Sequence, residues 1–322
     1  MVTVLTPLNQ LLHLLADGKF HSGTQLGTRL GISRSAVWKQ LQGLTELGLN
    51  LHRVRGQGYR LPGGLDLLDG NAIQQQLTAT AAEQLHALQV VMSTTSTNQQ
   101  LQRQVKQRAL RCVLLAELQT AGRGRRGRSW QSPFAKGISF SLNWSFAGGT
   151  GALEGLSLVV GLAVVRALEQ LGLLNAQLKW PNDVLVGGRK LAGILIEMHS
   201  DTTGSYEVVI GIGLNVAQTQ ADGQSIDQPW VSLRQLGLQV SRNIVTVAII
   251  NHLVDHLLSF QKIGFAGFQH RWHSYHCHQH QLVNLHLSER MITGICRGVN
   301  SSGALLLQQD TKMVAFSGGE VS

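Results

Sequence analysis

Apolar and polar positions over about the first sixty residues predict three helices followed by a hairpin. One stripe at helical spacing consists of Leu8, Leu11, Leu12 and Leu15. Ser22 and Ser33 are good N-caps for two further helices, and Gly31 separates them. Two short strands are expected at residues 49–54 and 59–61. Helix, glycine-containing turn, helix and basic hairpin is the pattern of a winged helix-turn-helix.

After a linker signal at residues 62–64, helical and strand patterns are mixed. A helix is expected to start near Thr97, and a long apolar helix should cover residues 154–171. The expected strands are residues 113–117, 138–144, 178–180, 184–186, 191–198 and 208–216. Gly187 and Gly188 would join two of them as a hairpin. Sequential hairpins among helices favour an α+β fold over a regular βαβ repeat.

The end of the chain is strand-like, with turns at residues 300–303 and 317–319, and fits a small β-barrel. The segment before it, residues 271–281, is polar and is interpreted as a connection. Its neighbourhood is crowded with His270, His273, His276, Cys277, His278 and His280. Their irregular spacing, without a second pair of ligands at a typical distance, argues against a zinc site. We expect domains at residues 1–66, 67–273 and 274–322.

Composition narrows the class of protein. The 322 residues are 43% hydrophobic and 14% charged, which leaves little room for disorder. A formal net charge of +9 predicts an anionic partner, and the charge is densest over residues 1–66. Three cysteines without a CxxC spacing argue against a disulfide framework. We see no signal peptide and no expected helix long enough to span a bilayer, so we predict a cytoplasmic protein without a membrane partner.

The third N-terminal helix carries a polar face that suits DNA. Inward-facing Val37, Leu41 and Leu44 leave Arg34, Ser35, Trp38 and Lys39 exposed. Such a face fits a major groove, while Arg53, Arg55 and Arg60 on the hairpin could contact phosphates. The alternative is a small protein-interaction module with a solvated basic face. The hairpin and the charge favour DNA.

Glycines and arginines alternate over residues 122–128, the most unusual stretch of the chain. Glycine lets the backbone approach a ligand closely, and guanidinium groups suit carboxylate and phosphate oxygens. No Gly-Lys-Ser/Thr follows, so this is not a Walker A loop. From residue types alone, a disordered basic loop that contacts nucleic acid is an equally good interpretation.

Two further segments place polar groups at strand ends. Pro181 turns the chain so that Asn182 and Asp183 lie at a strand edge, where Asp183 could help to hold Mg²⁺; an ordinary Asx turn is the alternative. Lys190 precedes an apolar strand and could stabilise charge on a carboxylate or α-phosphate. Its alternative is a surface lysine whose stem covers apolar neighbours.

Together these stretches resemble the bacterial biotin–protein ligases that carry an N-terminal winged helix-turn-helix. The resemblance covers nearly the whole chain. Its parts are the N-terminal module, Ser96-Thr97-Asn98, the Gly-Arg loop, residues 179–183, 189–194 and 211–215, and residues 303–307. It implies a mixed-sheet catalytic domain like that of class II aminoacyl-tRNA synthetases and a C-terminal SH3-like barrel. Two positions depart from the family pattern. Thr120 replaces a frequent glutamine, which is a peripheral change, whereas Val37-Trp38 alters the DNA-reading helix, so the operator sequence is not implied.

The resemblance also implies roles for individual residues. Biotin-binding positions are Ser96, Thr97, Asn98, Gln119, Arg123, Gly124, Arg125 and Lys190, of which Arg125 and Lys190 are catalytic. ATP- or adenylate-binding positions are Arg128, Asn182, Asp183, Asn215 and Trp230. DNA-binding positions are Gly23, Ser33, Arg34, Ser35, Trp38, Lys39, Gln42 and Arg55. No dedicated metal site is implied, although Mg²⁺ would arrive with ATP, near Asp183.

The implied activity has two steps: biotin and ATP form biotinyl-5'-AMP, and the biotin is then transferred to a lysine of the biotin carboxyl carrier protein of acetyl-CoA carboxylase. The same protein would repress biotin biosynthesis genes as a homodimer on operator DNA, with biotinyl-5'-AMP as co-repressor. A lipoate–protein ligase is disfavoured by the N-terminal module and the Gly-Arg loop. A non-enzymatic biotin sensor is disfavoured because Arg125 and Lys190 are both present.

Overall fold

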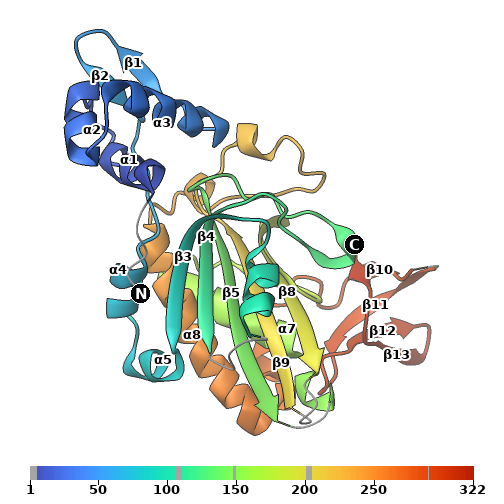
Figure 1. Ribbon diagram of the computed structural model, residues 1–322. Coiled ribbons are helices and arrows are strands. Elements are labelled where there is room, and N and C mark those ends of the chain that lie inside the picture. Colours follow the sequence, from blue (N-terminus) through green and yellow to red (C-terminus); the bar gives the residue numbers. More distant parts are fainter. Residues whose placement is uncertain (1–5, 106–110, 148–149, 201–204, 289) are drawn as a thin grey trace.

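The computed structural model describes residues 6–105, 111–147, 150–200, 205–288 and 290–322. In this part of the chain a small helical domain, a central mixed sheet with its helices and a C-terminal antiparallel sheet follow one another (Figure 1). The helices are α1 (Pro7–Leu15), α2 (Gly23–Leu30), α3 (Arg34–Glu46), α4 (Gly70–Gln75), α5 (Ala79–Gln84), α6 (Thr97–Val105), α7 (Leu156–Gln170), α8 (Arg242–Ile263) and α9 (Gln269–Tyr275). The strands are β1 (His52–Val54), β2 (Gly58–Arg60), β3 (Ala87–Thr94), β4 (Cys112–Gln119), β5 (Gly137–Ala147), β6 (Gln177–Lys179), β7 (Asp183–Val186), β8 (Arg189–Ser200), β9 (Ser205–Asn215), β10 (Leu282–His286), β11 (Met291–Val299), β12 (Leu305–Gln309), β13 (Lys312–Phe316) and β14 (Glu320–Val321).

The N-terminal domain has the predicted three helices and hairpin. Ser22 forms a capping box with Gln25 at the start of α2, and Ser33 accepts a hydrogen bond from the Ala36 amide at the start of α3. Gly31 ends α2 with φ of 65°, a conformation that favours glycine. The inward stripes of α1 and α3 are buried, as predicted, except that Leu8 at the start of α1 is half-buried. The first strand of the hairpin is shorter than expected, and the second has the expected length but begins one residue earlier.

The central sheet is mixed, with the strand order β3-β4-β5-β9-β8-β7-β6. β3 and β4 are parallel and are connected through α6, whereas every other neighbouring pair is antiparallel. The predicted strands of this region are all present, mostly with longer bounds. β3 was not predicted.

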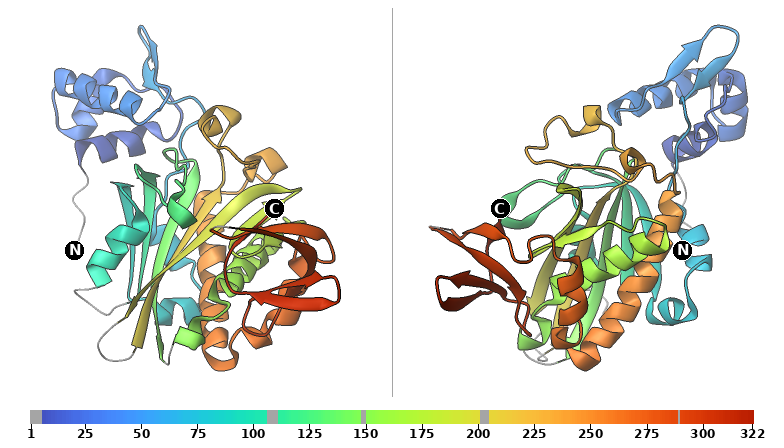
Figure 2. Two further views of the ribbon diagram at one scale, coloured as in Figure 1. Left: turned by 90° about the vertical axis from the view of Figure 1, so that its right-hand side faces the viewer. Right: turned by 180° about the vertical axis from the view of Figure 1, so that it is seen from behind.

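The two faces of this sheet differ in chemistry, and β5 shows the difference most clearly. Its even-numbered residues belong to the apolar core: Ile138, Phe140, Leu142, Trp144 and Phe146. Ser139, Ser141 and Asn143 alternate with them and are buried but polar. Helices α7 and α8 cover the apolar face (Figure 2). The opposite face carries α6 and the polar groups described below.

Helix α8 is the largest element that the sequence pattern did not reveal. Ser241 caps its start, and its buried residues lie on nearly every side because it packs between α7, α4, α5 and β5. By length and composition it could cross a membrane, but 56% of its most apolar window is buried inside the protein. Such burial is what a core helix of a folded domain shows.

The C-terminal sheet is antiparallel, with the strand order β13-β12-β11-β10-β14. The expectation that residues 271–281 form a plain connection is wrong for their first half, because α9 extends to Tyr275. Trp272 anchors this helix with 1% of its surface exposed, and the histidines around it obscured that apolar anchor. Residues 276–281 then lead into β10.

Candidate active site and DNA-binding surface

A cavity of about 330 Å³ opens on the polar face of the central sheet. The ends of β4, β8 and β9, the Gly-Arg loop, the loop before Trp230 and the C-terminal pair Gly319 and Glu320 line it. The structure brings together here all of the positions expected to bind biotin or adenylate. They are Ser96, Thr97, Asn98, Gln119, Arg123, Gly124, Arg125, Arg128, Asn182, Asp183, Lys190, Asn215 and Trp230.

One end of the cavity is built on the start of α6. Gln119 Oε1 accepts hydrogen bonds from the Thr97 amide (2.8 Å) and hydroxyl (3.1 Å). Ser141 Oγ lies within hydrogen-bond distance of Thr97 Oγ1 (2.7 Å) and Asn98 Oδ1 (2.6 Å). These buried side chains fix one another, which presents a rigid set of donors and acceptors to a small polar ring.

Glycines form the floor of the cavity. Gly193 on β8 is paired with Gly213 on β9, and Gly211 lies two residues earlier on the same face. The ring of Trp130 lies against Gly213, where any Cβ would overlap it, and Asn98 occupies the corresponding space above Gly211. Because these glycines carry no Cβ, the Trp130 ring and the Asn98 side chain pack directly on the sheet.

The Gly-Arg loop is folded over the cavity, and its four arginines contact four different partners. Arg123 Nη2 lies 2.8 Å from Glu197 Oε2 on β8, and Arg125 Nη1 donates to Asn182 Oδ1 (3.2 Å). The other two reach the C-terminal sheet. Arg126 Nη1 donates to His286 O (3.4 Å), and Arg128 binds both carboxylate oxygens of Glu320 (2.5 and 2.7 Å).

Two cationic groups lie inside the cavity. Lys190 Nζ is 2.8 Å from Asp183 Oδ1, and both side chains are 15% exposed. Burial lowers the pKa of Arg125, and the neighbouring charge of Arg126 lowers it further. Its hydrogen-bond partner Asn182 is neutral. A partly desolvated guanidinium and a half-buried ammonium in one cavity suit anionic ligands, and the position of Lys190 does not fit a surface lysine.

The loop that carries Trp230 is tied to the strand that carries Lys190. The Lys190 amide donates to Pro229 O, and Lys190 O accepts from the Val231 amide, both at 2.9 Å. Asn215 Nδ2 donates to Val231 O (3.2 Å). Trp230 is 8% exposed and covers Gly223, where a Cβ would overlap its ring. Asn215 and Trp230 thus form a further part of the cavity wall.

Several residues of the site were missed by the sequence reasoning. Trp130 closes the Gly-Arg segment, but no role was assigned to it. The alternation of Gly211 and Gly213 is a period-two signal that could have revealed one strand face without side chains, on which other groups pack closely. Glu197 and Glu320 hold the loop, yet nothing local marks them, because their arginine partners are 74 and 192 residues away in the chain.

The expected DNA-binding residues belong to α2, to α3 with its N-cap, and to the turn between β1 and β2. The β1–β2 hairpin projects away from the catalytic body (Figure 1). The exposed ones are Ser33, Arg34, Ser35, Trp38, Lys39, Gln42 and Arg55. Trp38 is 49% exposed, unusual for so large an apolar group. Gly23 is half-buried at the start of α2, and the hydroxyls of Ser33 and Ser35 lie 2.9 Å apart.

Among the described residues no group of three or more His, Cys, Asp or Glu side chains is arranged to hold a metal ion. The histidine-rich segment is instead part of the packing between α9 and the C-terminal sheet. His276 stacks on Trp272 with ring centroids 4.4 Å apart, and its burial lowers its pKa to about 4.

Comparison with protein families matches three segments of the chain. The biotin/lipoate A/B protein ligase family matches residues 88–215, an HTH domain matches residues 7–60, and the biotin protein ligase C-terminal domain matches residues 281–322. The matched segments contain the central sheet up to β9, the helix-turn-helix and hairpin, and the C-terminal sheet.

Curated relatives and solved structures agree with these matches. The bifunctional ligase/repressor BirA of Salmonella typhimurium is 39% identical over 312 residues, which are 97% of this chain and 96% of that protein. The biotin--[acetyl-CoA-carboxylase] ligase of Mycobacterium tuberculosis is 32% identical and covers 79% of this chain and 95% of its own. A biotin protein ligase from Aquifex aeolicus in complex with biotin and ATP superposes with a TM-score of 0.63 at 29% identity, over 74% of this chain and 98% of that one.

Proposed function

The chain belongs to the biotin protein ligase family, in its bifunctional ligase/repressor form, and we propose that it makes biotinyl-5'-AMP and transfers the biotin to a protein lysine. The acceptor we propose is the biotin carboxyl carrier protein of acetyl-CoA carboxylase, by analogy with the relatives. The observation that carries the proposal is that Arg125 and Lys190 line the same cavity as the polar groups at the start of α6. Two anionic reactants need such neutralising charge, and a small polar ring needs such donors and acceptors.

We assign the α6 end of the cavity to the biotin ring. Its donors and acceptors come from Ser96, Thr97, Asn98 and Gln119. Arg123 and Gly124 of the loop would close over it, and Lys190 would meet the biotin carboxylate. ATP would take the opposite end, with adenine near Trp230 and the phosphates near Arg128, Asn182, Asp183 and Asn215.

In the first step a carboxylate oxygen of biotin attacks the α-phosphorus of ATP, and pyrophosphate leaves. Lys190 would exchange its Asp183 partner for the carboxylate and the α-phosphate, which brings both anions together. Arg125 would stabilise the charge that develops on the phosphate oxygens. In the second step the deprotonated acceptor lysine attacks the acyl carbon and AMP leaves, while the Gly-Arg loop excludes water from the mixed anhydride.

Mg²⁺ is the metal we expect with ATP, where it would neutralise phosphate charge. The residues fit a metal that arrives with its substrate. Asp183 supplies one carboxylate at the cavity, and the described residues contain no group of three or more metal-ligating side chains. Asp183 would become available to the ion when Lys190 turns to the substrates.

The repressor half of the proposal rests on the exposed face of α3 and on the hairpin. Arg34, Ser35, Trp38 and Gln42 would contact base edges, while Lys39 and Arg55 would contact phosphates. Biotin biosynthesis genes are the proposed target, and biotinyl-5'-AMP is the proposed co-repressor. One such module makes few contacts, so we propose that two act together on an inverted repeat.

A homodimer would form along β8. Its residues up to Gly193 pair with β7, and Ile194 still bonds Asn182, whereas residues 195–200 pair with β9 alone. Met198 on this free edge is 57% exposed. An exposed strand edge with an apolar side chain invites pairing with a second copy across a two-fold axis. The carrier protein would compete for the same edge.

The finer structural and cellular assignments are also proposals. The central domain at residues 67–273 would share the class II aminoacyl-tRNA synthetase architecture, and the antiparallel sheet at residues 274–322 would be an SH3-like barrel. Residues 1–66 would be the winged helix-turn-helix. The protein would be cytoplasmic, where biotin, ATP, carrier protein and operator DNA meet.

Incubation with biotin, Mg-ATP and an isolated carrier domain, read by mass spectrometry, tests the enzyme assignment. We expect the carrier mass to rise by one biotinyl group, and the ligase without carrier to retain biotinyl-5'-AMP. Replacing biotin with lipoate is the control. Equal modification with lipoate, or recovery of biotin alone after incubation with ATP, would contradict the assignment.

A further inference from the structure

Residues 61–69, which we call the connector, join the winged helix-turn-helix to the catalytic body. At the N-terminal domain the Leu65 amide donates to Ala16 O (2.9 Å), directly after α1. Gly64 approaches the same carbonyl so closely that a Cβ there would overlap it. Leu65 and Leu67 pack against the apolar cluster of the N-terminal domain, which extends to Phe134 of the catalytic body. The connector is therefore fixed to the domain that it follows.

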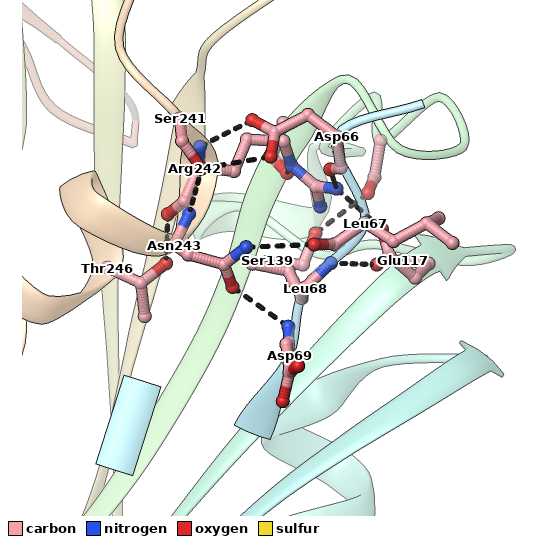
Figure 3. A network of polar contacts seen from close by, with 12 residues as sticks. Asp66, Leu67, Leu68, Asp69, Glu117, Ser139, Ser241, Arg242, Asn243 and Thr246 are labelled. Atoms are coloured by element: carbon pink, nitrogen blue, oxygen red, sulfur yellow. Dashed lines mark hydrogen bonds and ion pairs between the residues drawn. The ribbon is translucent and has the colours of Figure 1, made fainter. Parts of the chain in front are cut away.

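The Asp66 carboxylate fastens the connector to the start of α8 (Figure 3). It accepts hydrogen bonds from Ser241 Oγ (2.9 Å) and from the Arg242 amide (2.6 Å). The Asp66 carbonyl also accepts from Arg242 Nη1 (2.7 Å). A carboxylate at a helix N-terminus satisfies a free amide and is favoured by the helix dipole.

The next three residues are held as well. Asn243 Nδ2 donates to Leu67 O (2.9 Å), and Asn243 Oδ1 accepts from the Asp69 amide (2.8 Å). The Leu68 amide donates to Glu117 Oε1 (2.6 Å). From Leu65 to Asp69 every residue therefore makes a hydrogen bond to one body or the other. Although glycines precede it, this stretch is restrained by these hydrogen bonds, which restrict rotation of one domain relative to the other.

Arg242 is the centre of the network. Its side chain is fully buried, lies 2.6 Å from Glu117 Oε2 and donates from Nε to Gly137 O (2.8 Å). Glu117 precedes Gln119 of the biotin end by two residues on β4. Gly137 is paired with Asn215 of the nucleotide end. The guanidinium thus joins both walls of the active site to the connector.

The Asp66 carboxylate differs from the buried Arg242–Glu117 pair because its loss would not leave a buried charge without a partner. A buried ion pair such as Arg242–Glu117 cannot lose one partner without leaving an uncompensated charge. Asp66 is only half-buried, and without its carboxylate Arg242 keeps Glu117 and Gly137. Its carboxylate therefore sets the angle between the two bodies and contributes little to the catalytic core itself.

We propose that Asp66 is a positioning residue for operator binding: it holds the winged helix-turn-helix at a fixed orientation on the catalytic body through the start of α8. This inference rests on the repressor half of the proposed function. Two DNA-reading helices in one dimer bind neighbouring half-sites tightly only if their spacing and angle are set beforehand. Asp66 supplies that preorganisation.

The test compares Asp66→Asn with Asp69→Asn, which removes the same charge three residues away. Asp69 bonds Asn243 through its backbone, and asparagine can replace its carboxylate as the cap of α4. Asparagine at position 66 cannot accept from both Ser241 Oγ and the Arg242 amide. In Asp66→Asn we expect the Leu65, Leu68 and Asp69 amides to exchange with deuterium about tenfold faster, and Asp69→Asn to match the unaltered protein.

The functional readout is affinity for an inverted-repeat duplex that the adenylate-loaded protein selects from a randomised DNA pool. We expect Asp66→Asn to bind it about tenfold more weakly, with biotin transfer to the carrier domain unchanged. Equal affinity of the two variants, with or without faster exchange, would overturn the positioning role. If the unaltered protein enriches no duplex, the repressor assignment itself fails, and the unaltered protein alone reveals that failure.

Discussion

Lys190 and Arg125 lie in the same cavity but have different partners, and this difference separates their proposed tasks. Lys190 is paired with the Asp183 carboxylate, so its charge is balanced until a competing anion arrives. Arg125 donates to the neutral Asn182 side chain and belongs to the Gly-Arg loop, between Gly124 and Gly127. We therefore expect Lys190 to bring the two reacting anions together and Arg125 to retain the biotinyl-5'-AMP that they form.

Replacement of each residue should reveal this division. We expect Lys190→Ala to slow adenylate formation by about 10² to 10³, because charge developing on both reactants loses its counter-ion. Arg125→Gly should form the adenylate but release it about tenfold faster or more, which would label stray lysines. Single-turnover kinetics and release of labelled adenylate measure the two effects, with exposed Lys262→Ala as control. Unchanged retention in Arg125→Gly would disprove its shielding role.

At the scale of elements, the C-terminal sheet takes part in closing the cavity. Glu320 at the start of β14 binds Arg128 in a forked arrangement, and His286 O on β10 accepts from Arg126. The Arg128 and Glu320 side chains are 54% and 31% exposed, so the pair contributes little to folding. The pair instead attaches the Gly-Arg loop to β14, in addition to the attachment of Arg123 to Glu197 on β8.

Charge reversal should expose this role. We expect Arg128→Glu to release biotinyl-5'-AMP about fivefold faster, because the loop loses its tie to β14 and meets a like charge. The double variant Arg128→Glu/Glu320→Arg should recover part of the loss, since the pair is restored in reverse. Adenylate release rates of both variants decide the matter. A double variant no better than Arg128→Glu would argue that Arg128 acts on the ligand alone.

The sequence revealed local features and missed distant ones, for physical reasons. Ser22, Ser33 and Gly31 mark helix ends through their own backbone, so the N-terminal domain was predictable. Helix α8 was not, because it is apolar on nearly every side and shows no stripe. All predicted cavity residues meet in space, but Glu320 joins them only through folding. Trp130 needed the paired glycines opposite it to be understood.

Packing between α9 and the C-terminal sheet predicts a pH dependence of stability. His276 is 6% exposed, stacked on Trp272, and its pKa is lowered from 6.5 to about 4 by burial. The folded state therefore keeps it neutral while the unfolded state takes up a proton below about pH 6.5. The unfolding free energy linked to His276 is therefore highest above that pH and decreases as the pH falls toward 4.

His276→Gln should remove this contribution. From pH 7.5 to pH 5 we expect protonation linked to His276 to lower the unfolding free energy of the unaltered protein by about 2 kcal/mol. The unfolding free energy of the variant should therefore fall by about 2 kcal/mol less over the same range. Urea unfolding at the two pH values measures the difference, with exposed His270→Gln as the control. A pH dependence that is identical in His276→Gln and the unaltered protein would show that the burial of this ring has no such effect.

At the scale of the whole molecule, ligand, strand edge and DNA-reading helix lie in one connected body. Glu197 binds Arg123 of the Gly-Arg loop and Asn98 of the biotin end, and it lies on the part of β8 that pairs with β9 alone. A ligand that orders the loop would therefore also order the edge along which we propose the homodimer forms. Ordering that edge before association lowers the entropy that association must overcome.

We therefore expect biotinyl-5'-AMP, more than biotin, to shift the protein from monomer to dimer. Sedimentation velocity without ligand, with biotin and with biotinyl-5'-AMP measures the shift.

Met198→Glu should prevent dimerisation in all three conditions, because two carboxylates would face each other across the two-fold axis. Leu174→Glu, at an apolar position 78% exposed and away from β8, is the matched control and should dimerise normally. If the adenylate-loaded protein were no more dimeric than the ligand-free protein, the coupling would be disproved and the enzyme assignment would stand. If Met198→Glu still dimerised with adenylate, the dimer would have to use another surface, and abundant acceptor carrier would no longer be expected to relieve repression by competing for β8.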